Sequence, residues 1–219
     1  MKPVFAILAA TVALAGCGTD TGQNDMKSVL VGIKERGLKV EDAGTTAAPD
    51  VGTMLAGTTG PLRLVAFDLD GATAGVQQIA RNGAYRTFAT ADRRTITFEH
   101  GMMTATRGLG NDLMSANVDG SLALIRARKG GTAVRIMRYL DGENATQTLR
   151  FDCTVKPGAT GMTANGAVKA ATQQVTEYCK SDARSFNASY AVTSDGEIVA
   201  SHQWMSPARG MAKITVLRR

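Results

Sequence analysis

The sequence predicts a mainly β fold, an antiparallel meander that forms a barrel-like or sandwich domain with a short N-terminal helix. From Leu62 onward, short apolar or alternating runs recur, and each one ends at a Gly, Asn or Asp residue. This is the pattern of strands joined by hairpin turns. No fixed-period repeat and no low-complexity tract is present. Many short antiparallel strands are typical of a barrel or a sandwich.

A signal peptide is predicted at residues 1–16. Lys2 precedes an apolar run from Val4 to Leu14, which is shorter than the roughly 20 residues that a membrane-spanning helix needs. The tetrapeptide that ends in Cys17 (Leu14-Ala15-Gly16-Cys17) resembles the lipobox of bacterial lipoproteins. We therefore expect cleavage after Gly16 and lipidation of Cys17. Gly18 stands where an aspartate would signal inner-membrane retention, so we expect a lipid-anchored protein of the outer membrane that faces the periplasm.

Residues 17–25 are expected to form the lipidated N-terminus and a flexible tether, because the residues after Cys17 are small and polar. A single mostly-β domain is expected over residues 26–219. Its first element is a predicted helix at Met26–Arg36, where apolar residues are spaced by three and four, with Gly37 as its C-terminal cap. Glu41–Gly60 is rich in Gly, Thr, Ala and Pro and predicts a loop.

The strands of the predicted meander follow from Leu62 to Leu217. Val168–Tyr178 fits a helix or a strand equally well. The predicted strands are Leu62–Asp68, Gly75–Arg81, Tyr85–Thr90, Thr95–Glu99, Met102–Arg107, Ala133–Leu140, Thr146–Val155, Asn187–Thr193, Glu197–Trp204 and Met211–Leu217. The predicted turns are Arg81-Asn82-Gly83, Ala91-Asp92-Arg93, Glu99-His100-Gly101, Leu140-Asp141-Gly142 and Ser194-Asp195-Gly196.

The chain has three cysteines. Lipidation of Cys17 leaves Cys153 and Cys179 as an even pair in an oxidising compartment, which predicts a disulfide. A redox pair or a pair of metal ligands is the alternative. There is no CxxC spacing, however, and the two histidines, His100 and His202, are isolated. We expect no metal ion and no cofactor.

The net charge of +6 is modest, and the basic residues are scattered. Such a balance favours anionic partners, for example phospholipid head groups, lipopolysaccharide or acidic polysaccharide. Nucleic acid is not an expected partner, because no dense Lys/Arg tract is present.

One motif suggests catalysis. Asp68-Leu69-Asp70-Gly71 looks like the first motif of haloacid-dehalogenase phosphatases, and the segment from Gly110 to Met114 (Gly110-Asn111-Asp112-Leu113-Met114) resembles their magnesium loop. The residues between the two fragments predict hairpins, whereas a parallel sheet needs helical crossovers. Asp68–Gly71 is therefore interpreted as a strand end and a turn.

No catalytic residue is assigned, and no enzyme is predicted, because no GxSxG turn accompanies a histidine. His100 is interpreted as a turn residue. His202 beside Trp204 is either part of a sugar-binding surface or, as we favour, a half-buried strand position.

The segment from Thr104 to Ala116 (Thr-Ala-Thr-Arg-Gly-Leu-Gly-Asn-Asp-Leu-Met-Ser-Ala) resembles the YjbF/GfcB lipoproteins. The likeness extends to the Asn82-Gly83 turn, Arg94-Thr95-Ile96-Thr97, Cys153 and Cys179, His202-Gln203-Trp204, and Ser206-Pro207. Asn111 stands where we expect Asp or Gly in relatives. The resemblance implies an outer-membrane lipoprotein associated with group 4 capsule and exopolysaccharide export. It also implies a non-catalytic accessory whose partners, besides the membrane, are surface polysaccharide or other polysaccharide-export proteins.

Within this segment, Arg107, Gly108, Leu109, Gly110 and Asp112 form a predicted interaction loop. Its glycines permit positive φ, Arg107 can pair with Asp112, and Leu109 with Leu113 can turn inward. The loop is either a structural corner, which we favour, or a surface that offers Arg107 to an anionic glycan or a partner protein.

Two alternative functions remain: a haloacid-dehalogenase-like phosphatase, which we favour least, and a barrel that carries lipid or lipoprotein acyl chains. Such a carrier needs a dry apolar cavity.

Overall fold

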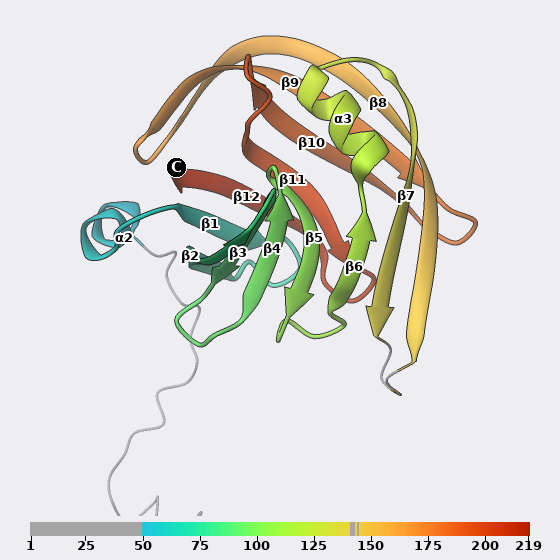
Figure 1. The fold of residues 1–219 in the computed structure, drawn as a ribbon, viewed down its shortest axis with the longest axis horizontal. Coiled ribbons are helices and arrows are strands. Elements are labelled where there is room, and N and C mark those ends of the chain that lie inside the picture. The colour runs from blue at the N-terminus through green and yellow to red at the C-terminus, as the bar shows by residue number, and fades with distance from the viewer. Residues whose placement is uncertain (1–49, 141–142, 144) are drawn as a thin grey trace, which may run out of the picture. The chain divides into compact units, whose positions relative to one another are not determined.

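Twelve antiparallel strands form one sheet in the computed structural model, which describes residues 50–140, 143 and 145–219 (Figure 1). The expected signal peptide, Cys17, the tether and the helix at Met26–Arg36 lie outside these residues. The strands are β1 (Leu62–Phe67), β2 (Thr73–Asn82), β3 (Tyr85–Ala89), β4 (Thr95–Glu99), β5 (Met102–Arg107), β6 (Leu113–Asn117), β7 (Gly131–Leu140), β8 (Thr146–Asn165), β9 (Val168–Lys180), β10 (Ser185–Thr193), β11 (Ile198–Ser206) and β12 (Gly210–Arg218).

The sheet curls into a nearly closed barrel. Its strand order is β5-β4-β3-β2-β1-β12-β11-β10-β9-β8-β7-β6, so the first strand pairs with the last and every other neighbour follows in sequence. The two ends of this order, β5 and β6, are consecutive in the chain and lie side by side (Figure 1). The predicted meander and barrel-like fold are therefore confirmed.

The predicted strands all occur, and the ambiguous segment Val168–Tyr178 is strand β9. The largest difference is β8, which was expected to end at Val155 and continues to Asn165. Pro157 cannot donate a ladder hydrogen bond. The strand passes it through an irregularity, because the register against β9 shifts between Pro157 and Thr160.

The predicted loop at Glu41–Gly60 is wrong for its last part, where Val51–Gly57 forms helix α2. Asp50 caps this helix, because its carboxylate accepts hydrogen bonds from the backbone N–H (2.7 Å) and the hydroxyl (2.7 Å) of Thr53. At the other end, the Arg218 guanidinium donates to the carbonyls of Leu55 (2.6 Å) and Thr58 (2.8 Å). A capping residue and a distant arginine thus stabilise a helix that composition alone did not indicate.

Two further elements were not predicted: strand β6 and helix α3 (Asp119–Ala127). Leu122 and Ile125 on α3 are buried, as is Val118 before it. This spacing of four and three residues is the helical signal that the sequence carried. Figure 1 shows α3 beside β7, β8 and β10 at one end of the strands.

No helix in the described ranges is long and apolar enough to cross a membrane.

Side chains fill the barrel interior, so the core lies between the curved walls. Trp204 stacks on Phe186, with ring centroids 5.2 Å apart, and meets Tyr139 and Phe151 edge to face. Near this cluster, buried Arg135 donates to the Glu177 carboxylate (3.0 Å), which also accepts from the Tyr190 hydroxyl (2.8 Å).

Candidate functional site

The predicted interaction loop is the corner that joins the two sides of the barrel seam, β5 and β6. Asp112 accepts hydrogen bonds from the backbone N–H groups of Gly108 (2.7 Å) and Leu109 (3.1 Å) and from the Thr106 hydroxyl (3.0 Å). The Thr106 hydroxyl in turn accepts from the backbone N–H of Leu113 (2.9 Å). Leu109 and Leu113 are buried, as predicted. The loop is therefore a structural corner.

The predicted Arg107–Asp112 pair is wrong. The Arg107 guanidinium instead donates to the carbonyls of Leu113 (3.0 Å) and Met114 (3.4 Å), across the seam on β6. Asp112 is already occupied by the corner's own N–H groups. Arg107 thus takes the place of ladder hydrogen bonds between β5 and β6.

The remaining predicted positions are structural. Cys153 on β8 and Cys179 on β9 are register partners joined by a disulfide, which confirms that prediction. Asp68-Leu69-Asp70 forms a turn after β1, as predicted, in an antiparallel sheet unlike that of the phosphatases. Asp68 pairs with His202 (2.7 Å).

The two histidines occupy the kinds of position that were favoured. His100 lies at the β4–β5 turn with φ +47°. His202 is half-buried on β11. Trp204 is only 8% exposed within the aromatic core, so it presents no stacking surface to a sugar.

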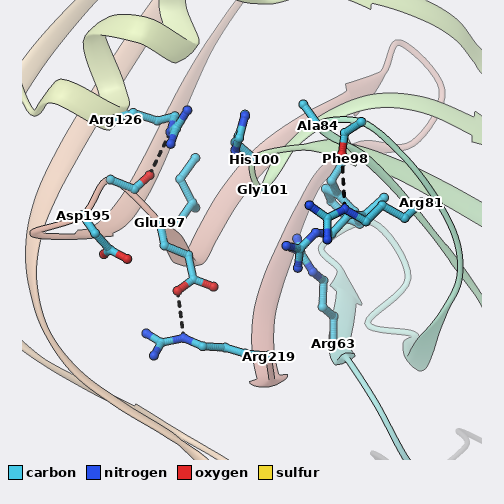
Figure 2. Close-up of a pocket in the computed structure, with 14 residues that line it drawn as sticks. Arg63, Arg81, Ala84, Phe98, His100, Gly101, Arg126, Asp195, Glu197 and Arg219 are labelled. Carbon is cyan, nitrogen blue, oxygen red and sulfur yellow. Dashed lines mark hydrogen bonds and ion pairs between the residues drawn. The ribbon is translucent and has the colours of Figure 1, made fainter.

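The candidate site is a cavity of about 640 Å³ that is lined by many charged side chains. It lies at the end of the barrel where the β2–β3, β4–β5 and β10–β11 turns meet. Small-molecule sites commonly occupy roughly 300–1,000 Å³. We call this cavity the arginine pocket, because five of its lining residues are arginines: Arg63, Arg81, Arg86, Arg126 and Arg219. Figure 2 shows Arg63 and Arg81 on one side of it and Arg126 and Arg219 on the other.

Tight turns bring the walls of the pocket together. His100 and Gly101 both have positive φ (+47° and +96°), as a two-residue hairpin turn requires. The Gln203 side chain holds this turn from inside the barrel, because its amide donates to the Gly101 carbonyl (2.9 Å) and accepts from the Met103 N–H (2.9 Å). A side chain at Gly101 would meet the Ile198 Cβ at 2.8 Å, so only glycine allows this close approach.

Most arginines of the pocket have partners within its wall. Arg219 forms an ion pair with Glu197 (2.7 Å). Arg126 donates to the Gly196 carbonyl (3.1 Å) and Arg81 to the Gly83 carbonyl (3.3 Å), and neither forms an ion pair with a carboxylate among the described residues. The two carboxylates that line the cavity, Asp195 and Glu197, are fewer than the arginines. The pocket therefore carries an excess of positive charge.

Arg63 and Arg86 have no hydrogen bond or ion pair to a residue that the structure describes. Arg63 is the buried one of the two: it lies on β1, only 8% of its surface is exposed, and its Nε is buried without an acceptor. Its guanidinium lies against Phe98 (4.4 Å from the ring centroid) and Phe88 (4.6 Å). Burial, with the nearby charge of Arg86, lowers the pKa of Arg63 to about 10.

Arg63 is nonetheless charged at neutral pH. His100, which also lines the pocket, has a lowered imidazole pKa, because burial and, to a smaller extent, the charge of Arg126 disfavour its protonated form. The arrangement can therefore bind an anion through fixed guanidinium groups.

Sequence reasoning missed the arginine pocket. Its arginines come from β1, β2, β3, α3 and the C-terminal end, positions 63 to 219, and no local motif links them. The available signal was Arg63 inside the apolar run Leu62–Phe67, where strand alternation places it on the same face as the apolar residues Val65 and Phe67.

A second hollow, of about 520 Å³, lies at the opposite end of strands β1 to β4. Its lining includes the buried apolar side chains of Val65, Phe67, Val76, Ile96 and Leu109. At its rim Arg209 pairs with Asp70 (3.3 Å). Side chains fill the barrel interior, so an acyl chain of the carrier alternative would lie in this hollow, whose lining also includes charged residues such as Asp92 and Arg94.

Residues 39–217 match the family described as "Group 4 capsule polysaccharide lipoprotein gfcB, YjbF". No curated protein sequence matches the chain significantly.

Among solved structures, the hypothetical lipoprotein YmcC from Escherichia coli is similar, with a TM-score of 0.66, 13% identity, and coverage of 80% of this chain and 98% of that chain. An exported protein with a YmcC-like fold from Bacteroides fragilis is similar over 72% of this chain and 93% of its own, with a TM-score of 0.36 and 11% identity. At these identities, the YmcC likeness concerns the fold.

Proposed function

The chain belongs to the YjbF family of group 4 capsule polysaccharide lipoproteins, and from this premise we propose that it is a non-catalytic accessory in the export or assembly of surface polysaccharide. In this proposal the acyl chains on Cys17 hold it to the outer membrane, where the barrel faces the periplasm. Its partners are the polysaccharide itself or other proteins of the export machinery.

The arginine pocket is the observation that carries the proposal. Many fixed guanidinium groups at a barrel end suit an acidic polymer, because each binds carboxylate or phosphate oxygens with paired N–H donors. The matched family concerns capsule polysaccharide, and capsule polymers that bear acidic sugars present such groups along their length. The positive charge would attract the polymer at a distance as well as hold it.

The proposal is tested by deleting the gene and measuring extracellular and capsular polysaccharide. We expect the amount at the surface to fall, and the wild-type gene to restore it. A Cys17→Ser variant keeps the barrel but loses the acylated thiol, so it should restore polysaccharide poorly and should leave the membrane fraction. An unchanged amount of polysaccharide in the deletion strain would contradict the proposal.

The second hollow supports one other function, the carriage of an acyl chain. Its apolar lining would bury methylene groups at about 0.8 kcal/mol each. A displacement assay with a fluorescent fatty acid separates the two functions. The export proposal expects no saturable binding of the fatty acid, whereas a carrier would bind it and release it on addition of palmitate.

A further inference from the structure

Arg63 is buried as deeply as a core residue but lacks the counter-ion that a buried charge normally has. The structure describes one other buried arginine, Arg135, whose guanidinium contacts the Glu177 carboxylate at 3.0 Å. Arg63 has no carboxylate within ion-pair distance among the described residues, and its Nε is buried without an acceptor. A buried cation without a counter-ion is costly, so buried charges are normally paired.

The surroundings of Arg63 leave room for a counter-ion from outside. The Phe88 and Phe98 rings contact the guanidinium, and their own edge-to-face packing fixes them at 5.7 Å between centroids. Because Arg63 lines the cavity, the acceptor it lacks can enter from solvent. Rings that hold a guanidinium in place leave its N–H edge free for a planar, two-oxygen acceptor.

The charge of the pocket limits what that acceptor can be. Arg86 and Arg126 have no ion pair with a described residue and would attract an anion towards Arg63. Asp195 and Glu197 on the opposite wall would repel a group with two negative charges. The same carboxylates accept hydrogen bonds from hydroxyl groups. The pocket therefore fits a ligand with one negative charge and several hydroxyls.

We propose that the arginine pocket binds an acidic sugar residue, whose carboxylate receives the N–H donors of Arg63 while its hydroxyls donate to Asp195 and Glu197. This inference rests on the proposed function, because it assigns the part of the polysaccharide that the protein recognises. Arg86 and Arg126 supply attraction, and Arg63 supplies the specific contact.

The test uses the chain as the cell produces it, purified in a detergent without sugar groups, and isothermal titration calorimetry with trigalacturonate. The methyl ester of trigalacturonate is the matched probe, since it keeps the sugar and removes the charge. We expect trigalacturonate to bind and its ester to bind about 10- to 100-fold more weakly, the range of one charge-assisted hydrogen bond. Inorganic phosphate is the third probe, and tighter binding of phosphate than of trigalacturonate would overturn the choice of a carboxylate.

Arg63→Met is the main variant, because methionine fills much of the same space without donors. It should weaken trigalacturonate binding about 10- to 100-fold and reduce the difference between the acid and its ester to the part that Arg86 and Arg126 contribute. Arg63→Lys, which keeps the charge but not the forked donors, should fall between the two. Arg150→Met is the control: Arg150 is exposed on β8 and pairs only with exposed Asp152 (3.2 Å). Circular dichroism checks that each variant is folded.

Equal affinity of folded Arg63→Met and wild-type protein for trigalacturonate would overturn the inference, as would the absence of binding to either. Two combinations of results distinguish failure of this inference from failure of the proposed export role. If deletion lowers surface polysaccharide but Arg63→Met restores it fully, the export role stands and this inference fails. If trigalacturonate binds through Arg63 while deletion leaves polysaccharide unchanged, the sugar site stands without the export role.

Discussion

The seam corner and the arginine pocket are both built around an arginine, and they use it in opposite ways. In the corner, the Arg107 guanidinium donates to carbonyls of β6 and Asp112 accepts three hydrogen bonds from neighbours in sequence. In the pocket, Arg63 is far more deeply buried and has no polar partner among the described residues. Arg107 and Asp112 therefore have their polar partners within the fold, whereas the partner that we propose for Arg63 comes from outside it.

This difference is the reason that we assign stability to the first region and propose binding for the second. Polar groups that a fold satisfies internally contribute to its stability. A buried charge that the fold leaves unpaired lowers stability, and such costs are typical of functional sites. The family-like segment around Arg107 has the internal bonding of a structural corner, and the site that we propose for binding lies elsewhere.

The largest predicted effect is that of Asp112→Ala in the corner. The substitution removes the acceptor of three hydrogen bonds and leaves two backbone N–H groups without it, so we expect a loss of about 3 kcal/mol in the free energy of unfolding. Urea denaturation measures it. Asp152→Ala is the control and should cost less than about 1 kcal/mol, because Asp152 is an exposed ion-pair partner. A change at Asp112 as small as at Asp152 would refute the structural role of the corner.

Arg107→Met should have a smaller effect of the same sign. It removes the two hydrogen bonds across the seam, at an exposed side chain, so we expect a loss of about 1–2 kcal/mol. Trigalacturonate binding should stay unchanged, because Arg107 does not line the arginine pocket. Weaker binding in this variant, with the fold intact, would return the glycan-binding role to the corner.

Arg63→Met should have the smallest effect, and the opposite sign. Removing the buried unpaired charge should raise the free energy of unfolding by about 1 kcal/mol, because lost contacts with the two phenylalanine rings offset part of the relief. A loss of stability would contradict this prediction, because it would mean that Arg63 makes a net stabilising interaction within the fold.

The difference in the free energy of unfolding between Arg63→Met and the wild type should also depend on pH. The pKa of Arg63 is lowered to about 10 in the folded protein, so from about pH 10 upward the unfolded state binds a proton that the folded state has lost. Stability of the wild type then rises with pH relative to the variant. The advantage of Arg63→Met should therefore be complete below about pH 9 and shrink as pH rises through 10.

Local patterns were sufficient for most of the fold. Glycine, asparagine and aspartate mark the ends of strands, so the meander, its turns within the described residues and the inward leucines of the corner were predictable; the predicted turn at Leu140-Asp141-Gly142 lies partly outside those residues. Helix α2 was not, because its stability comes from Asp50 and from Arg218 at the far end of the chain. The same limit applies to the site. The role of Arg63 depends on Phe88, Phe98 and a cavity wall that only the folded barrel assembles.

The pairing of β1 with β12 has a consequence for the order in which the molecule can be made. Synthesis proceeds from the N-terminus, so β1–β5 and β6–β11 can each form hairpins as they emerge, but β1 and β11 lack a neighbour until β12 arrives. Until then, both are open edges that invite pairing with other chains. The barrel is therefore completed from its last strand, and a chain interrupted before Gly210 holds two half-sheets that meet at the β5–β6 corner but lack the β1–β12–β11 pairing.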